Sequence, residues 1–349
     1  MTAPKLGDPT RIAGLRAGAF IDAGSLMDSL HSDANAGRAV SGQHFLPVGF
    51  EPLDRVLGGG LRPHDLLVVA GRPGVGKTIV SLQMARNLAL SGVTVVFACY
   101  EHDPLALLAR LLALEIGTLD PTHRDLYRSD GIRNLLGDVV SGYAPLSSTS
   151  SDPLVRAARS RMDEYAFRLH FVRAAPSETG LEELRSIVEQ VRSGPTVLFV
   201  DYLQKVRPDH QSSTHLEHVA QVTAGLKEAS LKLAFSVVAV SAISAVGLTR
   251  RRVHLAHLDS PAAVGFDSDI VVLLNDKRSI VSANRVSNTL EQYQSLRQRV
   301  VFTVEKNRGG EAPIDVEFVK DFEHFRFEPS GSYVAEQLIE DGEHDDFRV

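Results

Sequence analysis

The chain has a single cysteine, Cys99, among its 349 residues. One cysteine excludes an internal disulfide and a cysteine-rich zinc site, so a reducing cytoplasm is the expected location. No window approaches about 18 uninterrupted apolar residues, which argues against a membrane-spanning helix. The first residues do not combine a charged segment with a long apolar one, so we expect no secretory signal.

Acidic and basic residues are also present in nearly equal numbers over most of the chain. The formal net charge is −6, but residues 329–349 alone carry six acidic residues against one arginine. We expect this segment to be a disordered acidic tail, because it contains few apolar residues. The remaining body is close to neutral. Such a balance neither supports nor excludes nucleic-acid binding, since a ring can concentrate its basic residues along one channel.

The most informative stretch has the pattern of a phosphate-binding loop, GxxxxGK[ST]. The apolar run Leu66–Ala70 predicts a buried parallel strand before it, and Ile79–Leu90 predicts a helix after it. Glycines let backbone N–H groups approach an anion closely, and the helix adds the positive end of its dipole. The sequence therefore predicts a nucleoside triphosphate site. Its expected residues are Gly71, Arg72, Pro73, Gly74, Val75, Gly76, Lys77, Thr78 and Ile79.

Strand and helix patterns alternate from Leu46 onward, with near-continuous apolar strands. This alternation predicts an α/β fold with a mostly parallel sheet, helices on both faces and a C-terminal antiparallel hairpin. Residues 118–175 look polar and irregular, with at least two weak helices. We expect three parts: an extension over 1–45 with a short helix, a nucleotide-binding domain over 46–328, and the tail over 329–349.

Two acidic residues follow predicted core strands. Asp201 ends the strand 196–200, and Glu101 comes two residues after the strand 93–99. Beside a phosphate loop, a carboxylate at a strand end is suited to hold Mg²⁺, and a nearby glutamate is suited to deprotonate the attacking water. Alternatively, Asp201 is a helix or turn cap and Glu101 a solvated loop acid. Gln204 lies close enough to Asp201 to sense the γ-phosphate.

A second cluster, Lys306-Asn-Arg-Gly-Gly, runs from a predicted strand into glycines before another strand, which is typical of a hairpin. Its two cations, Lys306 and Arg308, have two interpretations. They can be solvated edge charges that discourage sheet extension. They can instead reach the γ-phosphate of a neighbouring subunit, as an arginine finger with a lysine partner. Spacing alone does not separate the two.

Three motifs stand in the order Gly71-Arg-Pro-Gly-Val-Gly-Lys-Thr, Asp201-Tyr-Leu-Gln and Lys306-Asn-Arg-Gly-Gly. In this order they resemble the C-terminal ATPase domain of the DnaB replicative helicases. Further similar segments are Val48-Gly-Phe-Glu-Pro-Leu-Asp-Arg, Val219–Lys227 and Leu255–Leu274, which includes Asp267-Ser-Asp269. The resemblance covers about residues 46–328. The segment Phe20–Leu30 resembles the family's linker helix, which docks on the adjacent subunit, and we expect the separate N-terminal helical domain to be absent.

The resemblance implies a RecA-like fold and a helicase-type ATP hydrolase, with ATP and Mg²⁺ as ligands. It further implies action on single-stranded DNA as a homo-oligomer, expected to be a hexameric ring. The implied roles are Lys77 and Thr78 toward the phosphates and Mg²⁺, Asp201 toward the metal through water, Glu101 as catalytic base, Gln204 as sensor, and Lys306 and Arg308 in trans across a ring interface.

Two departures from the family pattern bear on the motor activity. The family commonly has Ser-Gln-Leu-Ser-Arg where this chain has Ser241-Ala-Ile-Ser-Ala, so alanines stand at positions 242 and 245. Both positions lie where the state of the nucleotide is thought to be coupled to DNA-contacting loops. Asp259 and Ser260 replace another pair that tends to be Arg-Glu. Nucleotide binding is untouched by these changes, whereas efficient DNA-stimulated translocation is placed in doubt.

Three functions therefore compete. The first is a ring-forming, DnaB-type ATPase that acts on single-stranded DNA. The second is a non-translocating ATP-dependent switch or regulatory oligomer of the KaiC or RadA kind, which Ala242 and Ala245 favour. Asp201-Tyr-Leu-Gln and the lack of a zinc ribbon favour the first. A small-molecule phosphotransferase is poorly supported, because it needs a lid and an acceptor pocket.

Overall fold

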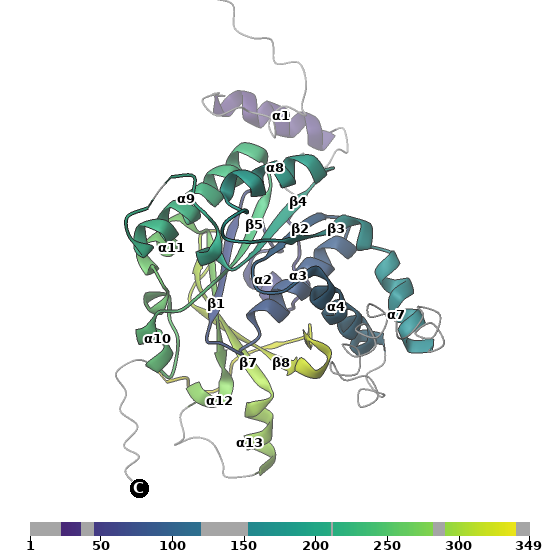
Figure 1. The fold of residues 1–349 in the computed structure, drawn as a ribbon, viewed down its shortest axis with the longest axis vertical. Coiled ribbons are helices and arrows are strands. Elements are labelled where there is room, and N and C mark those ends of the chain that lie inside the picture. Colours follow the sequence, from purple (N-terminus) through teal and green to yellow (C-terminus); the bar gives the residue numbers. More distant parts are fainter. Residues whose placement is uncertain (1–21, 36–44, 120–152, 211, 282–289, 340–349) are drawn as a thin grey trace, which may run out of the picture.

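In the computed structural model, the described residues are 22–35, 45–119, 153–210, 212–281 and 290–339. Their centre is one sheet in the order β10-β8-β7-β6-β1-β5-β4-β2-β3, with β9 paired to β8 beside this path (Figure 1). From β6 to β3 neighbouring strands are parallel, whereas β7, β8 and β10 pair antiparallel. The strands are β1 Leu66–Gly71, β2 Thr94–Cys99, β3 Leu169–Arg173, β4 Thr196–Asp201, β5 Ser236–Ser241, β6 Ile270–Asp276, β7 Arg299–Asn307, β8 Ile314–Asp321, β9 Arg326–Phe327 and β10 Ser332–Tyr333.

Helices cover both faces of this sheet (Figure 1). The parallel strands are buried on both sides, because alternate residues enter different cores. In β1, Leu67 and Val69 pack with α3 and α4, whereas Leu66 and Val68 pack with α8 and α9. The predicted fold class is confirmed. The helices are α1 Ala23–Asn35, α2 Leu53–Val56, α3 Lys77–Leu90, α4 Pro104–Leu119, α7 Pro153–Asp163, α8 Leu181–Val191, α9 His215–Leu233, α10 Ala245–Thr249, α11 Pro261–Asp267, α12 Lys277–Ile280 and α13 Leu290–Arg297.

The parallel arrangement gathers the predicted site residues at one edge. Ala70 pairs with Ser241, Val240 pairs with Asp201, and Asp201 pairs with Cys99. The carboxyl ends of β1, β5, β4 and β2 therefore lie side by side, with the phosphate loop directly after β1. In open α/β sheets this edge is where ligands bind.

Two segments differ from the sequence prediction. The stretch expected to be irregular contains β3, which pairs with β2 at the sheet edge. Only Leu169 of β3 is buried, so the strand lacks the continuous apolar pattern of the central strands. The tail expected to be disordered is folded at least to Ile339. There β10 pairs with β8, and Leu338 and Ile339 are buried; Leu338 packs with Ile280, Val281 and Val301.

The expected N-terminal helix is present as α1, and its docking on another subunit stays a prediction. Residues 1–21, 120–152 and 340–349 of the predicted extension, irregular stretch and tail lie outside the described residues. Within the described ranges, no helix is long and apolar enough to cross a membrane.

Candidate nucleotide-binding site

The loop between β1 and α3 has a backbone that only glycine adopts easily. Gly74 and Gly76 have φ angles of 78° and 104°, in the left-handed region. A Cβ on Gly76 would also lie 2.7 Å from ring carbons of both Phe322 and Phe327. Gly76 is the N-cap residue of α3, and no side chain in the described structure caps it. The first N–H groups of this helix are therefore available to an anion.

Lys77 lies inside the loop and is buried. Its Nζ donates to the carbonyl oxygens of Gly71, at 2.9 Å, and Arg72, at 3.0 Å. Burial lowers the pKa of Lys77, and the negative charges of Asp201 and Glu101 oppose this shift. An ammonium held by two loop carbonyls is placed to exchange them for the more strongly charged oxygens of a phosphate.

Asp201 and Thr78 form an oxygen-rich pair beside this lysine. The Thr78 hydroxyl donates to Asp201 Oδ2 at 2.7 Å. Asp201 is fully buried, and its Oδ1 has no hydrogen-bond partner among the described residues. Burial raises the pKa of Asp201 to about 6. A buried carboxylate oxygen without a partner, next to a hydroxyl, suits a hard cation such as Mg²⁺, so these residues fit the metal expected with a nucleotide.

The raised pKa of Asp201 has a consequence for stability without nucleotide. Between the ordinary value of 3.8 and about 6, the folded protein binds a proton that the unfolded chain has released. The free energy of unfolding should therefore fall as pH rises from about 4 to about 6, by about 3 kcal/mol in total, and stay low above that range. Asp201→Asn should remove this contribution. We expect urea unfolding to show the variant gaining stability relative to the parent as pH rises. If the difference in the free energy of unfolding between variant and parent stayed the same from pH 4 to pH 8, this prediction would be wrong.

Glu101 lies on the exposed loop after β2, and its charge acts on both Lys77 and Asp201. The hydroxyl of Tyr202 hydrogen-bonds to Glu101; burial first, and then this carboxylate, raise the pKa of Tyr202 to about 12. An exposed carboxylate that a neutral phenol orients is suited to accept a proton from water. Tyr202 was not predicted as a site residue, although it directly follows Asp201.

Gln204 joins the ends of β4 and β5. Its Nε2 donates to Ser241 Oγ at 2.9 Å, and its Oε1 accepts from the backbone N–H of Ala242 at 3.1 Å. Both contacts go to the segment in which the sequence departs from its family. Ala242 thus contacts Gln204 only through its backbone N–H, because its side chain has no polar group. Ala245 is exposed at the start of α10.

An open cavity of about 670 Å³ adjoins the phosphate loop at Arg72. It is lined by Arg72, Arg251, Asp276, Arg278, Ser279, Arg297 and Lys320. This predominantly cationic lining attracts anions toward the loop. The neighbouring Arg252 is instead buried and forms an ion pair with Asp315 at 2.8 Å, so it supports the fold.

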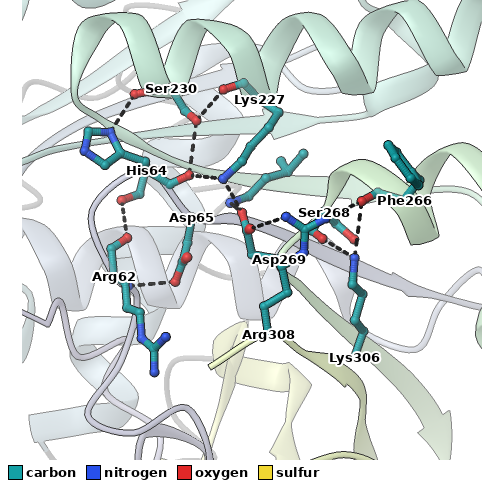
Figure 2. A network of polar contacts seen from close by, with 12 residues as sticks. Arg62, His64, Asp65, Lys227, Ser230, Phe266, Ser268, Asp269, Lys306 and Arg308 are labelled. Carbon is teal, nitrogen blue, oxygen red and sulfur yellow. Dashed lines mark hydrogen bonds and ion pairs between the residues drawn. The ribbon is translucent and has the colours of Figure 1, made fainter. Parts of the chain in front are cut away.

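Lys306 and Arg308 lie beside the start of β6, at the opposite end of the parallel strands from the phosphate loop. Asn307, between them, pairs with Ile270 at the start of β6, whereas Gly71 of the phosphate loop pairs with Leu274. About four residues of strand, roughly 13 Å, separate these positions. Both side chains contact the C-terminal end of α11 (Figure 2). The structure therefore does not bring this pair to the phosphate loop of its own chain.

The comparisons with known proteins agree with this geometry. The family model described as the DnaB-like helicase C terminal domain matches residues 46–126 and 147–327. The chain belongs to this family. Its relatives include the replicative DNA helicase DnaB of Treponema pallidum, 27% identical over 67% of this chain and 48% of that protein. The DNA repair protein RadA of Synechocystis is 29% identical over 50% of this chain and 32% of its own length.

Solved structures show the same fold. A separately solved ATPase domain superposes with a TM-score of 0.66 at 18% identity, covering 88% of this chain and 99% of that one. A DnaB-like replicative helicase, solved in a study of its interactions with primase, gives a TM-score of 0.65 at 17% identity over 88% of this chain and 67% of its own. The chain spans between 42% and 48% of the length of three replicative helicases that it matches.

Proposed function

We propose that this DnaB-family domain binds ATP with Mg²⁺ and hydrolyses it. The observation that carries the proposal is the group at one sheet edge: Lys77 in a glycine-shaped loop, Thr78 bonded to the buried Asp201, and Glu101 exposed beside them. In this proposal Lys77 and the loop N–H groups bind the phosphates, and Thr78 and Asp201 hold the metal, Asp201 through water. Mg²⁺ supplies charge neutralisation at the phosphates. Glu101 accepts the proton of the attacking water.

Hydrolysis takes place between neighbouring copies in a ring, which we propose is hexameric. Arg308 supports this part, because it is half exposed at the strand ends opposite its own phosphate loop, whereas Lys306 beside it donates to the carbonyl oxygens of Gly265 and Ser268. From there they can serve only a nucleotide bound by another copy, where cations stabilise the charge of the transferred phosphoryl group. The relatives that are named replicative DNA helicases support single-stranded DNA as the partner along which the ring acts.

A second candidate is an ATP-dependent switch with weak coupling to DNA. The observation in its favour is the contact of Gln204 with the backbone of Ala242, since alanine offers no side-chain hydrogen bond to either nucleotide or DNA loops. Coupling needs contacts that differ between the two nucleotide states, and one set is missing here.

The rate of ATP hydrolysis with and without single-stranded DNA tests both candidates. We expect binding to DNA that weakens with salt, as backbone contacts do, together with stimulation of less than about threefold. Ala242→Gln combined with Ala245→Arg should increase the stimulation, because it restores the polar side chains of the family pattern at the end of β5 and the start of α10. Strong stimulation and processive unwinding by the parent protein would contradict weak coupling. Gln204 would then be the residue expected to couple ATP hydrolysis to DNA.

A further inference from the structure

Arg308 is held by its own subunit on one side only. Its Nη2 donates to the carbonyl oxygen of Phe266 at 2.6 Å, and its Nη1 lies 3.4 Å from Asp269 Oδ1 (Figure 2). A guanidinium carries five N–H donors, so these two contacts leave others unused. The side chain remains 51% exposed. Arg308 is therefore oriented and still able to bind an anion.

The anchor in this arrangement is Asp269, whose side chain is 8% exposed. Its Oδ2 accepts from the backbone N–H of Leu66, at 2.8 Å, and from Lys227 Nζ, at 2.6 Å. Lys227 also donates to the carbonyl oxygen of His64, at 2.8 Å. Because Oδ2 is fixed from β1 and α9, the carboxylate cannot rotate freely and Oδ1 stays directed at Arg308.

The charges in this group are unevenly shared. Asp269 lies between two cations, and Lys227 at 2.6 Å is closer than Arg308 at 3.4 Å. Lys227 therefore contributes more to the compensation of Asp269 than Arg308 does, while Lys306 adds a third cation and Asp267 a second carboxylate to the group. A fully paired arginine would have to break an ion pair before binding a phosphate. Arg308 can bind one through its unused donors and keep its contact with Asp269.

We propose that Asp269, fixed by Lys227 and the Leu66 N–H, positions Arg308 for the nucleotide of the neighbouring subunit. The inference rests on the proposed function, since it needs Arg308 to act in trans. An exposed arginine at a hairpin tip would otherwise sample many rotamers, and orienting it beforehand reduces the entropy lost in the transition state. Asp269 touches no substrate and acts only through Arg308.

Asp269→Asn tests the inference, because the amide keeps the shape and loses the charge. We expect kcat for ATP to fall on the order of tenfold while KM stays within about twofold, since the nucleotide cradle lies at the other edge. Asp65→Asn is the matched control: Asp65 is a neighbouring carboxylate that accepts from the Arg62 N–H and does not contact Arg308. The control should retain the parent rate.

A mixing experiment separates positioning from a general structural role. Lys77→Ala subunits lack their own site but carry an intact Arg308, so adding them should raise the turnover of Asp269→Asn subunits severalfold. Damage to the Asp269→Asn subunit's own site would not be rescued. In an Arg308→Ala background, Asp269→Asn should cause no further loss, and a full additional tenfold loss would overturn the proposal.

Loss of the charge leaves the half-buried Lys227 without its ion-pair partner and with only the His64 carbonyl oxygen as acceptor, so Asp269→Asn can fail to fold. Asp269→Asn with Lys227→Met removes both charges and should fold while remaining slow; recovery of the parent rate would overturn the positioning role. If Arg308→Ala is slow and Asp269→Asn is not, this inference alone is wrong. If Arg308→Ala turns over at the parent rate, the trans role and this inference both fail.

Discussion

Lys77→Ala is expected to reduce ATP turnover on the order of 10³-fold, because it removes the cation that faces the β- and γ-phosphates. The affinity for ATP should also fall, by roughly 10- to 100-fold, as expected for the loss of a charge-assisted hydrogen bond. Lys77 is buried and hydrogen-bonded within the loop. Little further ordering is then required of it, which makes its contribution large. Single-turnover hydrolysis and equilibrium binding of ATP measure the two effects.

Glu101→Gln is the matched contrast for that measurement. It should leave ATP affinity close to the parent value and reduce turnover by about 10²-fold, because in the proposed mechanism Glu101 accepts a proton and is not part of the phosphate cradle. Thermal unfolding of both variants establishes that they fold. If Lys77→Ala bound and hydrolysed ATP like the parent, the loop would not be the nucleotide site. If Glu101→Gln did so, another residue would be the base.

The parts of this site that could be predicted from sequence are those built from local chemistry. The glycines of the phosphate loop must adopt left-handed angles, and Lys77 and Thr78 are placed by the loop itself. Asp201 could be found because it directly ends an apolar strand. The order of motifs then related the chain to its family, and the family model matches nearly the range expected.

The parts that could not be predicted depend on contacts distant in sequence. Asp269 is 42 residues from Lys227 and 203 residues from Leu66 along the chain, and neither separation leaves a pattern in composition or periodicity. The same holds for Leu338, whose burial depends on its packing with Ile280, Val281 and Val301. The prediction of disorder rested on the acidic composition of the tail, but five of its six acidic residues lie at 340–349, outside the described residues, and the described part carries the apolar ones.

Arg308→Ala is expected to reduce turnover on the order of 10³-fold at unchanged ATP affinity, because an arginine finger stabilises charge that develops in the transition state. The side chain is oriented by Phe266 and Asp269 and lies at the edge opposite its own phosphate loop. In the proposed trans arrangement, the nucleotide that it serves is therefore bound by another copy. Hydrolysis by the parent should accordingly rise more steeply than linearly with protein concentration through the range in which copies assemble.

Mixing two inactive variants gives the clearest measurement of this arrangement. Arg308→Ala subunits keep an intact Lys77, and Lys77→Ala subunits keep an intact Arg308. In random rings of equal amounts, about one quarter of the interfaces combine an intact site with an intact finger, so about one quarter of the parent activity should return. A cis-acting Arg308 predicts no recovery, because each chain then carries one damaged component of its own site. Full activity of a strictly monomeric protein in sedimentation and turnover assays would exclude the trans arrangement, and Lys306 and Arg308 would then serve only to hold α11 against the sheet.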